Sequence, residues 1–255
     1  MSLEPGVTFR VAARFHCRAA WAERLLVNGG VERRGGRILP RDDWRPPAAE
    51  ELRLLVADEQ APTAAGAHFE LLAIPAALRL RWWEIAEHDA AAGAPLPGYS
   101  EFVAEVLELL RFKRLPVPMA CAADVVVSRP GQTSTRLARD RRGLAGFGFG
   151  SLAARATDRC DTPIALINLG DERSHLVVLN LGSEALRAQP AATAVPAAAD
   201  RLLDAFFTRQ PGYPLVQVRL DPGEGLWFPM PPPAFDGWTH GKTDLDAMLI
   251  LRGET

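Results

Sequence analysis

The chain has 255 residues, of which 48% are hydrophobic and 24% charged, as is typical of a globular protein with one large domain or two small ones. Lys and Arg total 29 and Asp and Glu total 31, so the net charge of −2 gives no electrostatic reason to expect a nucleic-acid partner. No apolar run approaches the roughly 20 residues that a membrane-spanning helix needs, so a membrane partner is not expected either.

The cysteines and the first residues indicate a compartment. Cys17, Cys121 and Cys160 are far apart and no C-x-x-C occurs, so neither a disulfide framework nor a zinc site is predicted. The chain begins without a basic segment followed by an apolar one, so we predict no signal peptide. We therefore expect a cytoplasmic protein, and its abundant Ala, Arg, Gly and Pro suggest a bacterial source.

Strand and helix patterns alternate irregularly in the first 119 residues. Apolar and β-branched runs predict strands at 7–17, 23–30 and 68–75, and leucines at helical spacing predict helices at 48–59 and 77–90.

The clearest helix is expected at residues 99–114. Ser100 is a suitable N-cap, and Leu115-Pro116 ends the pattern. Five apolar residues recur at helical spacing on one face: Phe102, Val103, Val106, Leu107 and Leu110. This stripe predicts a packing helix without a chemical role.

Strand patterns dominate from about residue 120. A β-branched run predicts a strand at 123–135. Residues 162–182 hold two apolar runs joined by four polar residues, which predicts a β-hairpin. A short helix is expected at 198–210. Strands follow at 214–230 and 243–253, and the alternation of Val216, Val218 and Leu220 with polar residues is typical of a half-buried antiparallel strand.

These patterns predict an α+β, mainly β fold. Short strands with Pro/Gly turns favour a double-stranded β-helix, or jelly roll, with packing helices mostly from the N-terminal half. We expect a single domain over residues 1–255, in which residues 1–119 pack on a jelly-roll core at 120–252. A doubly wound α/β sheet is disfavoured because strand and helix patterns do not alternate regularly. The glycines at 143–151 lack the Lys-Ser/Thr of a phosphate-binding loop and predict a plain loop.

No single motif identifies a reaction. The five histidines form neither H-E-x-x-H nor H-x-H, and no G-x-S-x-G nucleophile elbow occurs.

Three segments in order nevertheless carry a resemblance to a known family. They are VVVSRPGQTSTRLARD (125–140), PIALINLGDERSHLVVLNLG (163–182) and VRLDPGEGLWFPMPPPAFDGWTHGKTD (218–244). The series resembles the core of the non-haem iron, 2-oxoglutarate-dependent oxygenases within the cupin, or double-stranded β-helix, superfamily, over residues 120–252. In that family a His-x-Asp and a distal His bind Fe(II), and a basic residue further on binds the cosubstrate carboxylate.

The resemblance is carried over residue by residue. Asp140 matches the Asp of His-x-Asp, but Ala138 stands at the His position. Phe235 stands where family members often have the His of His-Asp-Gly. The metal ligands that the resemblance implies are Asp140, His240 and His175. The implied cosubstrate anchors are Lys242, Arg136 and Arg252, and the implied substrate contacts are Trp238, Thr239 and Phe235.

Several functions remain open at this point. The first is a divergent oxygenase-like protein that uses Fe(II) and 2-oxoglutarate and acts on or binds a small polar metabolite such as an amino acid, in bacterial specialised metabolism. The second is a metal-free pseudo-oxygenase, without cofactor, that binds a small anion or a partner protein. A third is a metal-free enzyme that reuses the cavity for isomerisation or hydrolysis. Asp140 also has an ordinary interpretation as an ion-pair partner, and His240 as a solvated loop residue. The sequence allows a homodimer.

Overall fold

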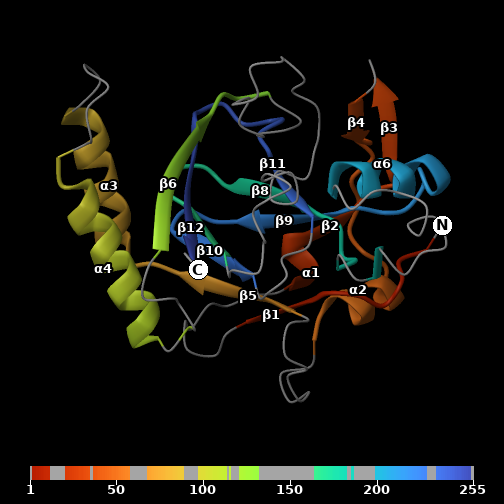
Figure 1. Cartoon of the computed structure of the whole chain (residues 1–255), viewed down its shortest axis with the longest axis horizontal. Coiled ribbons are helices and arrows are strands. Elements are labelled where there is room, and N and C mark those ends of the chain that lie inside the picture. Colours follow the sequence, from red (N-terminus) through yellow and green to blue (C-terminus); the bar gives the residue numbers. More distant parts are fainter. Residues whose placement is uncertain are drawn as a thin grey trace.

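A computed structural model describes residues 2–11, 21–34, 37–57, 68–88, 97–113, 115, 121–131, 164–182, 185–186, 199–228 and 234–253. Within these residues the chain is a mixed α and β structure with more strand than helix, as predicted (Figure 1). No helix in the same residues is long and apolar enough to span a membrane.

Two sheets form the body of the molecule, and a two-stranded ribbon extends from it. Sheet A has six strands, in the spatial order β1 (Thr8–Val11), β5 (His68–Ala73), β10 (Glu224–Phe228), β7 (Ile164–Asn168), β12 (Asp246–Gly253) and β6 (Cys121–Ser128). Sheet B has four, in the order β11 (Phe235–Trp238), β8 (Ser174–Val178), β9 (Val216–Leu220) and β2 (Leu25–Val27). The ribbon pairs β3 (Val31–Arg34) with β4 (Arg37–Pro40). Between these described strands, every pairing is antiparallel except that of β1 with β5.

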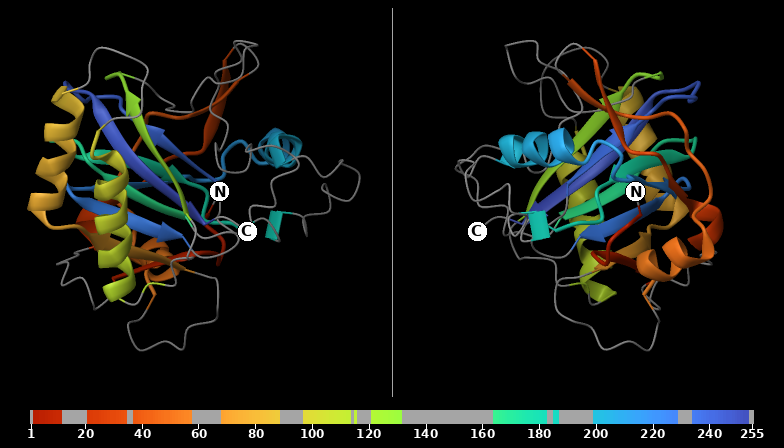
Figure 2. Two further views of the ribbon diagram at one scale, coloured as in Figure 1. Left: turned by 60° about the vertical axis from the view of Figure 1, so that its left-hand side comes forward. Right: turned by 90° about the vertical axis from the view of Figure 1, so that its right-hand side faces the viewer.

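Helices surround the sheets. They are α1 (Trp21–Arg24), α2 (Ala49–Leu55), α3 (Ala76–His88), α4 (Tyr99–Phe112) and α6 (Ala199–Arg209). Helices α3 and α4 pack together against one face of sheet A (Figure 2). The stripe predicted on α4 is confirmed, because Phe102, Val106, Leu107 and Leu110 are buried there and Val103 packs beside them.

The buried apolar side chains form two layers, one on each face of sheet A. On β12, Met248 and Ile250 pack into the layer between sheets A and B, whereas Leu249 and Leu251 pack under α3 and α4. This is the two-residue period of a strand that is buried on both faces. A run of aromatic rings crosses the layer between the sheets: Trp21, Phe9, Phe69, Phe228 and Phe235, with ring centroids 4.6–5.5 Å apart.

The prediction of a β-hairpin at 162–182 is wrong. Its two runs are β7 and β8, but β7 lies in sheet A and β8 in sheet B, so they do not pair. The buried amide of Asn168 explains the corner between them. Its Nδ2 donates to the carbonyls of Glu172 and Leu220 at 2.9 and 3.1 Å, and its Oδ1 accepts from the Gly170 N–H at 2.9 Å. These bonds satisfy the backbone of a turn that leads into the other sheet.

Two smaller predictions also need correction. The strand predicted at 23–30 is shorter, because α1 occupies its first residues and β2 begins at Leu25. The N-cap of α4 is Gly98 and not Ser100, which lies inside the helix. Gly98 has φ of 80°, a left-handed conformation that glycine adopts without a Cβ clash.

The N-terminal residues complete both sheets. β1 and β5 extend sheet A beyond β10, and β2 extends sheet B beyond β9. The antiparallel strand predicted at Val216–Leu220 is confirmed as β9, which pairs with both β8 and β2. It is not half-buried as predicted, because Gln217 on its second face is also buried. The layer between the sheets therefore draws side chains from both halves of the chain.

Candidate functional site

The layer between the two sheets has a polar end, made by Ser174, Lys242 and Asp246. Asp246 begins β12 in sheet A and Ser174 begins β8 in sheet B. Lys242 Nζ donates to Asp246 Oδ1 at 2.6 Å, and the Ser174 hydroxyl donates to the same oxygen. The side chains of Lys242 and Asp246 are only 3% and 5% exposed, so this ion pair is buried. It ties the two sheets together.

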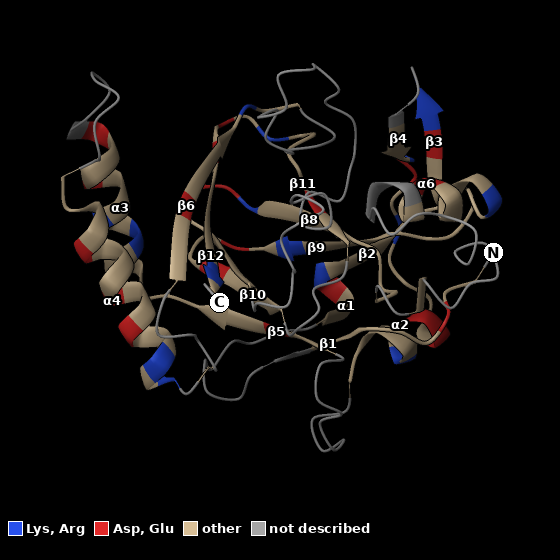
Figure 3. Cartoon of the chain, viewed as in Figure 1, with Lys and Arg blue, Asp and Glu red and all other residues tan. Residues whose placement is uncertain are grey.

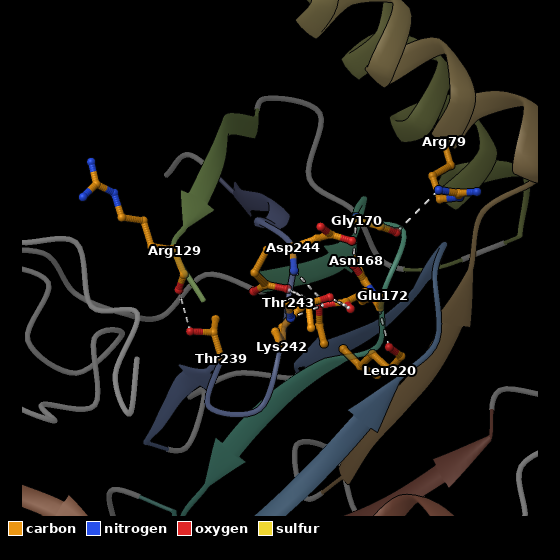
Figure 4. A network of polar contacts seen from close by, with 12 residues as sticks. Arg79, Arg129, Asn168, Gly170, Glu172, Leu220, Thr239, Lys242, Thr243 and Asp244 are labelled. Atoms are coloured by element: carbon orange, nitrogen blue, oxygen red, sulfur yellow. Dashed lines mark hydrogen bonds and ion pairs between the residues drawn. The ribbon is translucent and has the colours of Figure 1, made fainter. Parts of the chain in front are cut away.

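Glu172 adds hydrogen bonds on the solvent side of the polar end. Its carboxylate accepts the Thr243 hydroxyl at 2.5 Å and the backbone N–H groups of Thr243 and Asp244 at 3.1 and 3.2 Å (Figure 4). These bonds, the Thr243 hydroxyl first, lower the pKa of Glu172 below its ordinary value because they stabilise the charged form. The turn after β7 is thereby fastened to the turn before β12.

His175 lies on the outer face of sheet B, away from the layer between the sheets. It stands directly opposite Arg219 on β9 and Trp238 on β11, and Ser174 and Leu176 on either side of it face inward. Burial above all, followed by the charges of Arg219 and Lys242, lowers the pKa of His175 to about 4. The imidazole is therefore neutral at neutral pH. Its Nδ1 is buried and has no hydrogen-bond partner among the described residues.

The residues at the end of β11 and just after it, Trp238 to His240, mostly make structural contacts. Trp238 is 3% exposed, and its ring meets those of Trp44 and His240 at 5.7 and 5.8 Å. The buried Thr239 donates its hydroxyl to the Arg129 carbonyl at 2.7 Å. His240 is exposed, and its Nε2 lies 3.6 Å from an Asp42 carboxylate oxygen. His240 thus lies beside Trp238 on the outer side of sheet B.

The other end of the layer between the sheets is the aromatic end, made by Phe228, Phe235 and Arg252. Phe235 is 8% exposed and stacks on Phe228 with ring centroids 4.6 Å apart and an interplanar angle of 27°. Phe228 stands opposite Ile164, which stands opposite Arg252. Arg252 shares its strand face with Met248 and Ile250, so its side chain rises on the inner side of sheet A. It is exposed, and it makes no hydrogen bond or ion pair with the described residues.

The structure separates the residues that the resemblance groups together. His175 and His240 lie on the outer side of sheet B, whereas Phe235 points to its inner side. Lys242 lies at the polar end and Arg252 at the aromatic end, about 20 Å apart by the usual rise of a strand. Arg136 and Asp140 lie outside the described residues. In the part of the chain that the structure describes, no three His, Cys, Asp or Glu side chains gather to hold a metal.

Sequence reasoning missed Ser174, Asp246 and Glu172. Ser174 and Asp246 are the first residues of β8 and β12, and Glu172 lies in the turn before β8. In the sequence, such positions look the same as solvated turn residues. Only the three-dimensional pairing of the two turns distinguishes them.

A scan against protein-family models finds no match for this chain, and a search of curated proteins finds none either.

Replacement of Lys242 tests the energetic role of the polar end. We expect Lys242→Met to lower the free energy of unfolding by about 3–5 kcal/mol, because it leaves the Asp246 carboxylate buried and unpaired. The double variant Lys242→Met, Asp246→Leu should lose less, since no charge is then left uncompensated. Urea denaturation measures both. Arg33→Gln, which breaks the exposed pair with Asp204, is the control and should cost no more than about 1 kcal/mol. A cost for Lys242→Met as small as that of the control would refute this role.

The depressed pKa of His175 predicts a pH dependence of stability. The unfolded chain takes up a proton near pH 6.5, whereas the folded chain does so only near pH 4, so acid favours unfolding between these values. At about 1.4 kcal/mol per pKa unit, the free energy of unfolding should fall by roughly 2.5 kcal/mol between pH 7 and pH 4.5. His175→Gln should flatten this slope, and His240→Gln, at an exposed histidine, should retain it. Equal slopes in the two variants would contradict the assignment.

Proposed function

We propose that the chain is a double-stranded β-helix protein of the oxygenase-like group, and that it binds a small carboxylate-bearing metabolite, such as an amino acid, without iron at the metal position of that group. The observation that carries this proposal is the packing of Phe235, the residue that the resemblance aligns with the distal histidine, on Phe228 at the aromatic end.

The strand order supports the jelly-roll assignment. From β7 onwards the chain passes from sheet A to sheet B at β8, stays in sheet B for β9, and then alternates through β10, β11 and β12. The strands β6, β12, β7 and β10 lie side by side in sheet A, and β11, β8 and β9 in sheet B. A jelly roll built from two Greek keys has this alternation.

The aromatic end is not built to hold iron. A non-haem iron site needs two imidazoles and a carboxylate on one face with open positions opposite. Phe235 supplies no ligand atom, and the stacked Phe228 fills the space beside it. Neither His175 nor His240 can replace it, since both lie across sheet B from this end. The described residues therefore do not fit the Fe(II) that the resemblance implies.

The aromatic end keeps a cation suited to a carboxylate. Arg252 stands on the inner side of β12, exposed and unpaired among the described residues. A guanidinium binds a carboxylate through two parallel hydrogen bonds. Phe228 and Ile164, the next residues across the sheet, are buried in the core, so the ligand would bind at the surface through the Arg252 guanidinium. Of the other two predicted anchors, Lys242 is already neutralised by Asp246 at the opposite end, and Arg136 is not among the described residues.

Ligand-induced stabilisation tests the proposal. In the presence of a metal chelator, we expect 2-oxoglutarate, succinate or an amino acid to raise the melting temperature of the wild type by several degrees at saturating concentration. Arg252→Gln should lose the response, and Arg209→Gln, at an exposed arginine on α6, should keep it. A response that appears only with Fe(II), or that survives in Arg252→Gln, would defeat the proposal.

Restoring the family ligands tests the alignment on which the proposal rests. The double variant Ala138→His, Phe235→His recreates the two missing imidazoles beside Asp140. If the carry-over is correct, it should bind Co(II) or Fe(II) at one equivalent, measured by calorimetry and Co(II) absorption. Neither the wild type nor Ala138→His alone should do so. A double variant that retains the far-ultraviolet spectrum of the wild type and binds no metal would show that the alignment is wrong. Stoichiometric Fe(II) in the wild type would show that the iron-free assignment is wrong.

A further inference from the structure

Strand β6 forms one edge of sheet A. All eight of its residues pair with β12 on one side, from Cys121 opposite Gly253 to Ser128 opposite Asp246. On its other side no strand of the described residues lies against it (Figure 1). Along that side of Val125–Ser128, the backbone N–H and C=O groups have no partner strand within the described part of the chain, so they can pair with another strand.

The sequence of β6 does not protect this edge. Cys-Ala-Ala-Asp-Val-Val-Val-Ser contains no Lys, Arg or Pro, and its register with β12 runs without a bulge. These are the devices with which monomeric proteins discourage edge-to-edge pairing. Asp124 is its one charged residue, and Figure 3 shows the strand almost free of charge.

An exposed apolar patch adjoins the same edge. Val127 on β6 is 53% exposed, and Leu245, just before β12, is 50% exposed. Val127 stands opposite Ala247, two residues after Leu245, so the two side chains lie near each other at one end of sheet A. Only two other large apolar residues in the described part of the chain are comparably exposed, Leu80 and Phe112.

We infer that this edge binds a second copy of the chain, with the two β6 strands antiparallel about a twofold axis at Val126. An axis normal to the sheet keeps each residue on its own face and sets residues of like parity opposite each other. Val126 then meets its own copy, Val125 meets Val127, and Asp124 meets Ser128. Three apolar pairings and two pairings of a carboxylate with a hydroxyl result.

This self-pairing explains why the second copy, rather than a foreign strand, is the occupant. The one charge of β6 is matched by a hydrogen-bond donor of β6 itself, so the strand complements itself without any other partner. The axis also brings the Val127 side chains of the two copies toward the same strip of the joined sheet. Two copies would form one continuous sheet of twelve strands, twice the six of sheet A.

The mass in solution tests the inference. We expect light scattering after size-exclusion chromatography to give twice the 27.7 kDa of the chain for the wild type. Val127→Lys, which sets an ammonium group opposite Val125 of the other copy, should give a monomer. Leu80→Lys, at an equally exposed leucine on α3, is the matched control and should remain a dimer.

Amide hydrogen exchange tests whether β6 forms the interface between the two copies. In the wild type, the amides of residues 121–128 should gain protection as the protein concentration rises, and in Val127→Lys they should not. A wild-type monomer at every concentration, a dimeric Val127→Lys, or a control that also dissociates would each overturn the inference. A monomer whose β6 is protected only on addition of a different protein would identify a foreign partner instead.

Discussion

The buried carboxylate of Asp246 is the contact on which the arrangement of the two sheets depends. It receives the Lys242 ammonium and the Ser174 hydroxyl on one oxygen, and these three groups come from a loop and from the first residues of strands in different sheets. A buried charge pair gives little net stability compared with apolar residues, but it is costly to break, so it favours one pairing of the turns over its alternatives. Glu172 strengthens that choice from outside, where it holds the backbone that leads to Asp246.

The two ends of the layer between the sheets have opposite chemistry. At the polar end Lys242 and Asp246 neutralise each other out of contact with water, so the Lys242 ammonium is not available to a ligand. At the aromatic end, the stacked rings of Phe235 and Phe228 are buried, and the guanidinium of Arg252 is exposed. A small anion therefore finds the exposed guanidinium of Arg252, unpaired among the described residues, at the second end, whereas the Lys242 ammonium at the first is already paired with Asp246.

The sequence predicts the elements of this structure better than it predicts their connections. Alternation identifies Val216–Leu220 as an antiparallel strand, although β9 is buried on both faces rather than half-buried, and helical spacing identifies the stripe on α4. Both are local periodicities. The corner between β7 and β8 depends on Asn168 reaching the Leu220 carbonyl, a contact between residues 52 positions apart. No local pattern reports such a contact. The partnership of Lys242 with Asp246, and of Asp246 with Ser174, is hidden for the same reason.

Strand β12 connects the two ends of the layer between the sheets, and the residues that the resemblance groups together lie at different ends of it. This one strand begins at the polar end with Asp246, carries Met248 and Ile250 through the layer between the sheets, and ends at the aromatic end with Arg252. β12 also pairs along eight residues with β6, the strand at the edge of sheet A. A substitution that shifted β12 by one residue would exchange its two faces, move Asp246 out of reach of Lys242 and turn Arg252 under the helices. The buried ion pair at one end of β12 thus sets which way the arginine at the other end points.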